Sequence, residues 1–125
     1  MYVDQGRTVD PAWYVALSSA VDLAPGPGGS RITPCGPIAW GGSVAKGAFV
    51  ALYPSSQLVA HVDPPIPGRR FHIPLVVNDG CWVFHCGVWQ QLDGGRIYQM
   101  DPTELHGAVN WGTERRLHLM IDTED

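Results

Sequence analysis

The chain has 125 residues, of which 45% are hydrophobic and 16% are charged. This length and composition suit one globular domain with a buried core, and they exclude a disordered chain. No apolar run reaches the length of a membrane-spanning helix, and the net charge of −4 gives no electrostatic basis for binding nucleic acid or an anionic membrane.

The cysteine count and the first residues bear on cellular location. The three cysteines are an odd number, and the first residues lack the basic and then apolar pattern of a secretory signal. We therefore expect reduced thiols and a cytoplasmic protein. The 15 glycines and 11 prolines indicate many turns, which all-β proteins need.

Residues 1–47 are predicted to form a short helix and a long loop in front of the rest of the domain. A polar lead-in, residues 1–9, precedes Asp10-Pro11, a typical helix start because aspartate caps free N–H groups and proline fits the first turn. Apolar residues then recur at helical spacing until about Leu23. The following loop, residues 24–47, is long for a compact domain, and we expect it to act as a lid or to hold short irregular strands.

From residue 48 onward the chain changes to short apolar runs that are separated by turn residues, as in a β-rich domain. Turn signals such as Asn78-Asp79-Gly80 divide this part into about eight strands, which favours a small β-barrel or jelly roll. No repeat or linker divides the chain, so we predict a single domain over residues 1–125. The predicted strands are Ala48–Tyr53, Leu58–Val62, Arg69–Val77, Cys81–His85, Val88–Leu92, Arg96–Met100, Glu104–Val109 and Arg115–Asp122.

A candidate metal site combines two of these strands. Residues two apart in an extended strand point to the same face, so His61 and Asp63 can reach one ion, and His106 can add a second imidazole. Two nitrogen ligands and one carboxylate suit ferrous iron and leave coordination positions open for substrates. The sequence therefore predicts His61, Asp63 and His106 as metal ligands.

Basic side chains are predicted to share the inner face of the same barrel. Arg70 and His72 alternate with apolar residues on the third strand, and Arg116 lies in the last strand. The planar guanidinium of arginine can bind a carboxylate through two parallel hydrogen bonds. Polar residues on the inner face of several strands favour a lined cavity over a solid core.

Several short segments also match one known family in their order and spacing. They are His61-Val62-Asp63, Arg70–Leu75, Gly95 with Tyr98–Asp101, His106 with Asn110, Arg116-Leu117 and Ile121-Asp122. On these segments the chain resembles the aspartyl/asparaginyl β-hydroxylase family of 2-oxoglutarate- and Fe(II)-dependent oxygenases. The resemblance implies a mainly β fold of the double-stranded β-helix (jelly-roll or cupin-like) type, and the strand pattern places the barrel at residues 48–125.

The resemblance also implies an activity and a role for each site residue. His61 and His106 would bind Fe(II), Arg116 would bind the distal carboxylate of the co-substrate 2-oxoglutarate, and Arg70 and His72 would be further co-substrate contacts. The implied dioxygenase uses dioxygen to decarboxylate 2-oxoglutarate to succinate and hydroxylates an Asp/Asn-type side chain in a protein, a peptide or a free amino acid. Some members of the family have glycine where this chain has Asp63, so a third ligand is available here, which could bind the metal directly or through a water molecule.

Two other hypotheses remain open from the residues. A cupin-like metalloprotein that does not use 2-oxoglutarate would not need Arg116. A barrel that only binds a small acid would not need the complete set of two histidines and one aspartate. A zinc site at Cys81, His85 and Cys86 is disfavoured, because these residues lack the paired spacing of structural zinc sites.

Overall fold

The computed structural model describes residues 1–9 and 29–125, and within these ranges the chain forms ten strands. The helix predicted to end near Leu23 lies outside the described residues. No helix in the described part of the chain is long and apolar enough to cross a membrane. The strands are β1 (Val3–Thr8), β2 (Ser30–Trp40), β3 (Ser43–Leu52), β4 (Ser56–His61), β5 (Arg70–Val76), β6 (Cys81–His85), β7 (Val88–Gln90), β8 (Arg96–Met100), β9 (His106–Asn110) and β10 (Arg116–Asp122).

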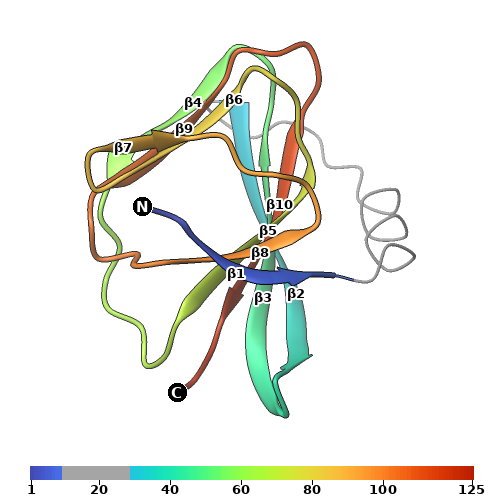
Figure 1. Cartoon of the computed structure of the whole chain (residues 1–125), viewed down its shortest axis with the longest axis vertical. Helices are drawn as coiled ribbons and strands as arrows, with labels where there is room; N and C mark the ends of the chain where they lie inside the picture. Colours follow the sequence, from blue (N-terminus) through green and yellow to red (C-terminus); the bar gives the residue numbers. More distant parts are fainter. Residues whose placement is uncertain (10–28) are drawn as a thin grey trace.

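The strands form two antiparallel sheets, which give the jelly-roll arrangement that the turn pattern predicts (Figure 1). The larger sheet has the order β1-β8-β5-β10-β3-β2, and the smaller has the order β4-β9-β6-β7. Neighbours in the sheets are often distant in sequence, so most of the register is set by long-range pairing. The β5–β10 pair, for example, places Met120 opposite His72 and Asp122 opposite Arg70.

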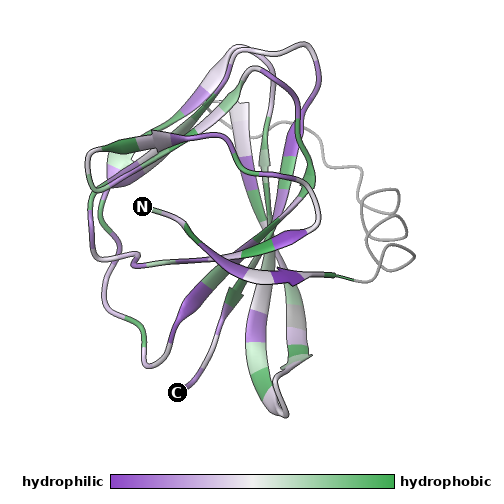
Figure 2. Cartoon of the chain, in the orientation of Figure 1, coloured by the Kyte–Doolittle hydropathy of each residue, from purple (hydrophilic) through white to green (hydrophobic). Residues whose placement is uncertain are grey.

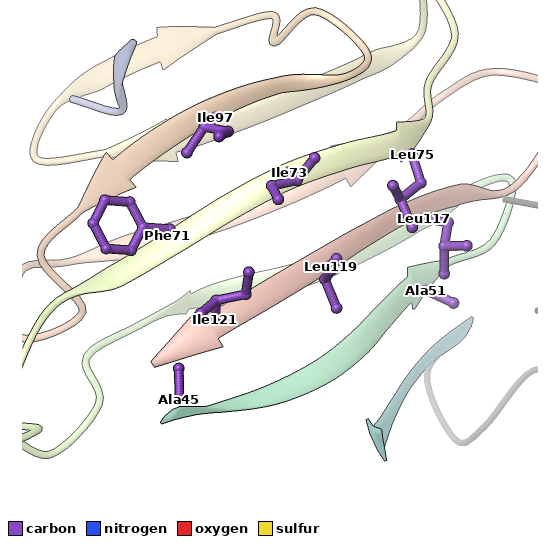
Figure 3. Close-up of a cluster of buried hydrophobic side chains, with 9 residues drawn as sticks. All are labelled: Ala45, Ala51, Phe71, Ile73, Leu75, Ile97, Leu117, Leu119 and Ile121. Atoms are coloured by element: carbon purple, nitrogen blue, oxygen red, sulfur yellow. The ribbon is translucent and has the colours of Figure 1, made fainter. Parts of the chain in front are cut away.

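Apolar residues lie on both faces of the larger sheet. Alternate residues of β5 and β10, such as Ile73, Leu117 and Leu119, belong to a cluster on one face and are almost fully buried (Figure 3). A second cluster joins the two sheets, because it combines Leu52 and Met100 of the larger sheet with residues of β6 and β9. The remaining alternate positions of β5 and β10 include the polar residues Arg70, His72, Arg116, His118 and Asp122, and Figure 2 shows hydrophilic and hydrophobic segments following one another along the strands.

The described part of the predicted loop at residues 24–47 forms regular strands instead. β2 and most of β3 make a long hairpin whose tight turn is Gly41-Gly42, both with positive φ (57° and 82°). The sequence pattern does not predict β2 as a strand, because β2 contains proline and glycine, which are unfavourable inside strands. Its place at the edge of the sheet tolerates these residues, and the pairing with β3 shifts register between Pro34 and Gly36.

The polar lead-in at residues 1–9 also forms a strand. β1 pairs with β8 at the other edge of the larger sheet, with Val3 opposite Gln99, and its register shifts between Asp4 and Thr8. An edge strand with mostly exposed side chains has no alternation of apolar and polar residues, so the hydrophobic pattern could not reveal it. The predicted boundary at residue 48 is therefore not a structural boundary, because β1 and β2 are hydrogen-bonded into the larger sheet.

Candidate metal centre and substrate cavity

Two neighbouring strands of the smaller sheet bring the predicted histidine ligands together. β4 pairs with β9 so that His61 lies directly opposite His106, and the centroids of the two rings are 4.4 Å apart. The His106 side chain is 10% exposed, and the His61 side chain, at the end of its strand, is 44% exposed. The pair is therefore buried on the His106 side and open to solvent on the His61 side.

Hydrogen bonds to the backbone fix which ring nitrogen of each histidine is free. Nδ1 of His61 lies 2.7 Å from the carbonyl oxygen of Val59, and Nδ1 of His106 lies 2.8 Å from that of Glu104. A carbonyl oxygen only accepts, so each Nδ1 carries the hydrogen and donates it. Each neutral ring then keeps a lone pair on Nε2, which is how histidines are oriented for metal binding.

Asp63 brings a carboxylate to the same two nitrogen atoms. Its Oδ1 is 3.5 Å from Nε2 of His61 and its Oδ2 is 3.3 Å from Nε2 of His106. One potential ligand atom from each residue lies within 4.8 Å of the other two, and these three residues form such a cluster among the described residues. The backbone N–H of Asp63 donates to the carbonyl oxygen of Pro102 at 2.9 Å, which ties the aspartate to the loop before β9. Two imidazoles and one carboxylate are the donor set that non-haem Fe(II) oxygenases use.

Arg70 links this cluster to the larger sheet. Its Nη1 donates to Oδ2 of Asp63 at 2.7 Å, while its Nε and Nη2 donate to the two carboxylate oxygens of Asp122 at 2.8 and 2.9 Å. The side chain is only 11% exposed, so these charge-assisted bonds are partly shielded from water. Three of the five N–H groups of a guanidinium are therefore used, and two remain for another acceptor.

A cavity of about 480 Å³ lies beside the cluster. The six predicted site residues all line it: His61, Asp63, Arg70, His72, His106 and Arg116. Its volume is within the usual range for small-molecule sites. These six residues lie between positions 61 and 116 of the sequence and thus meet in one concave site.

Arg116 is the most unusual member of the cavity lining. Its side chain is 2% exposed, and its buried Nε has no hydrogen-bond partner among the described residues. Burial lowers the pKa of this guanidinium, and no carboxylate contributes to opposing that effect. A buried cation without an anionic partner is costly, so this arrangement fits a site that takes its anion from a ligand.

His72 and His118 form a buried pair next to Arg116. Their Nδ1 atoms are 3.1 Å apart, so one ring donates and the other accepts, which requires at least one of them to be neutral. Burial, and then the charge of Arg116, lower the pKa of both imidazoles well below 6.5. Both rings are therefore neutral near neutral pH.

Acidification is expected to destabilise the fold through this pair. In the unfolded chain both imidazoles bind protons near pH 6.5, whereas in the folded chain they resist protonation until a lower pH. The unfolded state then binds more protons, so the free energy of unfolding is fully retained above about pH 6.5 and falls progressively below it. Denaturant unfolding between about pH 7.5 and 5.5 measures this slope, and His118→Phe removes one of the titrating groups. Equal slopes in wild type and variant would contradict the assignment.

Two residues of the site were missed from the sequence. Asp122 shares the face of β10 with Arg116 and His118, so alternation could have placed it near Arg70. Tyr2 also lines the cavity, but it precedes an unpredicted strand, and no sequence pattern indicated it. The disfavoured zinc site does not assemble: Cys81 is buried, Cys86 is exposed, and Nε2 of His85 lies 2.8 Å from the carbonyl oxygen of Asp101.

Solved structures with a similar fold support the predicted architecture. A cupin domain from Bordetella pertussis Tohama I matches with a TM-score of 0.56 and 15% identity, over 82% of this chain and 97% of that one. A double-stranded β-helix protein from Klebsiella pneumoniae matches with a TM-score of 0.58 and 17% identity, over 79% and 80%. A salicylate 1,2-dioxygenase variant from Pseudoaminobacter salicylatoxidans, in complex with gentisate, matches with a TM-score of 0.56 and 14% identity, over 89% of this chain and 30% of that one. The predicted mainly β, double-stranded β-helix fold is confirmed.

The sequence itself matches one family model. Residues 36–125 match the model described as aspartyl/asparaginyl β-hydroxylase, while a comparison with curated proteins finds no match. The matched region contains β3 to β10 and with them every predicted site residue. Together with the cupin fold, this match indicates a hydroxylase of the cupin-type metalloenzymes. The chain belongs to the aspartyl/asparaginyl β-hydroxylase family.

Proposed function

We propose that the protein is a 2-oxoglutarate- and Fe(II)-dependent dioxygenase that hydroxylates an Asp/Asn-type side chain in a protein, a peptide or a free amino acid. The observation that carries this proposal is one cavity lined both by a cluster of two histidines and an aspartate and by a buried arginine whose Nε has no partner among the described residues. The cluster suits iron, and the arginine suits the distal carboxylate of a dicarboxylic acid.

In this proposal, His61, Asp63 and His106 hold the iron through atoms that are already directed toward one another. Arg70 keeps the Asp63 carboxylate in place, since one of its N–H groups donates to Oδ2. Arg116 binds the distal carboxylate of 2-oxoglutarate. His72 and the two remaining N–H groups of Arg70 are further contacts for the co-substrate, as the family resemblance implies. Iron and 2-oxoglutarate would supply the oxidising chemistry, in which dioxygen decarboxylates the co-substrate to succinate and carbon dioxide and a substrate C–H bond is hydroxylated.

The buried walls of the cavity have a second role in this proposal. Arg116 and His72 line the cavity and are each at least nine-tenths buried, so water has little access to the inner end of the cavity. A carboxylate bound there exchanges its water for the fixed cation of Arg116 and the neutral imidazole of His72. In such surroundings a charge-assisted bond is stronger than in water.

Turnover of the co-substrate tests the proposed function. Protein loaded with Fe(II) in air is expected to convert 2-oxoglutarate to succinate, slowly alone and faster with a hydroxylatable amino acid or peptide. His106→Ala serves as the metal-deficient blank, because it removes one imidazole from the cluster. Oxygen uptake that depends on iron but consumes no 2-oxoglutarate would contradict the proposal and favour a cupin-type dioxygenase of another kind. Salicylate and gentisate are suitable first probes for that alternative, given the fold shared with the salicylate 1,2-dioxygenase.

A further inference from the structure

Tyr2 places a phenol in the cavity from a part of the chain that lies outside the family match. The residue precedes β1, its side chain is 5% exposed, and it lines the cavity together with His72 and Arg116. Its ring makes a T-shaped contact with that of His72, with centroids 5.4 Å apart and an interplanar angle of 79°. It packs in a similar way against His85, at 5.7 Å and 69°. The ring is thus wedged between residues of the two sheets.

The backbone of Tyr2 is fixed from both sides of the barrel. The side-chain amide of Gln90 accepts a hydrogen bond from the Tyr2 N–H at 2.7 Å and donates one to the Tyr2 carbonyl oxygen at 3.1 Å. Gln90 belongs to β7 of the smaller sheet, whereas the next residue, Val3, pairs with Gln99 of the larger sheet. Figure 1 shows this end of the chain running between the two sheets. These anchors hold the ring without using its hydroxyl group.

The hydroxyl of Tyr2 is suited to donate a hydrogen bond to an anion. Burial raises the pKa of Tyr2 to about 12, although the charge of Arg116 opposes the rise, so the phenol stays protonated. The hydroxyl has no hydrogen bond to a described residue. Among charged groups, Arg116 has the largest electrostatic effect on the phenol, and the phenol in turn has the largest such effect on Arg116. A cation and a neutral donor therefore line one cavity, and each shifts the pKa of the other.

We propose that the Tyr2 hydroxyl donates a hydrogen bond to the carboxylate that Arg116 binds, so that the segment leading into β1 contributes a positioning residue to the co-substrate site. This inference rests on the proposed function, because it assigns Tyr2 to the distal carboxylate of 2-oxoglutarate. Pairing of β1 with β8 would then help to hold Tyr2 at the co-substrate site. A guanidinium and a phenol together would satisfy both oxygens of the carboxylate, which a buried carboxylate requires.

The test compares two ligands that differ only in the distal carboxylate. 2-Oxoglutarate and 2-oxobutanoate are titrated anaerobically into the Fe(II)-loaded wild type, Tyr2→Phe and Tyr98→Phe. Tyr98 is a matched control, since its hydroxyl accepts a hydrogen bond from the N–H of Asp93 and does not line the cavity. Tyr2→Phe is expected to raise the Kd of 2-oxoglutarate about tenfold, the effect of one lost hydrogen bond to a charged group. It should leave the Kd of 2-oxobutanoate unchanged, and Tyr98→Phe should change neither value.

Three results would overturn the inference, and they have different meanings. Unchanged 2-oxoglutarate affinity in Tyr2→Phe, with wild-type binding intact, overturns the role of Tyr2 and leaves the proposed function standing. An equal loss for both ligands shows that Tyr2 acts through the general shape of the site. Failure of the wild type to bind 2-oxoglutarate overturns the proposed function and this inference with it.

A second measurement uses only the wild type, so its result does not depend on whether Tyr2→Phe folds correctly. In protein labelled at the Cζ carbon of tyrosine, the NMR signal of Tyr2 should shift when 2-oxoglutarate is added to the metal-free protein. 2-Oxobutanoate should leave that signal in place, because it lacks the distal carboxylate. A Tyr2 signal that does not shift although 2-oxoglutarate binds would also overturn the inference.

Discussion

Replacing Arg116 with methionine is expected to abolish the binding of 2-oxoglutarate and, at the same time, to stabilise the metal-free protein. The loss of binding follows because methionine cannot pair with the distal carboxylate. The gain in stability follows because Arg116 is buried, with an Nε that lacks a partner among the described residues. Leaving a buried polar group unsatisfied costs about 1–3 kcal/mol, and methionine removes that cost while filling a similar volume.

Two measurements on the same variant check this prediction. Chemical denaturation of metal-free protein should give Arg116→Met a free energy of unfolding higher than wild type by about 1 kcal/mol or more. Calorimetry should show that Fe(II) still binds and that 2-oxoglutarate no longer does. Arg96→Met is the control, because Arg96 does not line the cavity and forms an ion pair with Asp4 at the surface, where such pairs contribute little to stability. A less stable Arg116→Met, or one that still binds 2-oxoglutarate, would contradict the account.

Replacing His106 with alanine is expected to reduce Fe(II) affinity by at least about 100-fold. Loss of a residue that only hydrogen-bonds to a metal ligand already costs up to about 100-fold, and His106 is expected to be a ligand itself. His106 supplies one of the two imidazoles of the cluster, and its Nε2 lies close to Oδ2 of Asp63. The remaining pair, His61 and Asp63, is more exposed and would hold the ion weakly. Anaerobic titration of the metal-free variant with Fe(II) measures the change.

His85→Gln provides the matched control for this experiment. His85 lies opposite His106 in the neighbouring strand, and the two rings are 6.5 Å apart, but His85 is not part of the ligand cluster. A glutamine amide can still donate to the carbonyl oxygen of Asp101 that His85 contacts. Iron affinity should therefore stay near the wild-type value in His85→Gln. Equal losses in the two variants would mean that the metal is held elsewhere.

Turn chemistry and strand alternation made much of the barrel predictable. The bounds of β6 and β8 agree with the predicted strands, because strong turn signals precede both of them. Alternation along β5 and β10 correctly separated the apolar residues of one face from the face that carries Arg70, His72 and Arg116. The spacing of His61, Asp63 and His106 likewise anticipated a cluster that the structure assembles across the β4–β9 pair.

Other features depended on contacts that a local pattern does not contain. Proline and glycine in β2 resembled a loop, and only the edge position makes a strand possible there. Tyr2 reaches the cavity because Gln90, 88 positions away, holds its backbone. Arg70 was correctly placed on the inner face, but its bonds to Asp63 and Asp122 required knowledge of how β5 and β10 are aligned.

The central claim is that one cavity holds Fe(II) and 2-oxoglutarate together. The most direct test adds Fe(II) and then 2-oxoglutarate to metal-free protein without oxygen, and records the visible charge-transfer band of the chelated complex. The account predicts a band that appears only with both components, saturates with 2-oxoglutarate, and is absent in Arg116→Met. Iron binding without any band, at saturating 2-oxoglutarate, would contradict the claim.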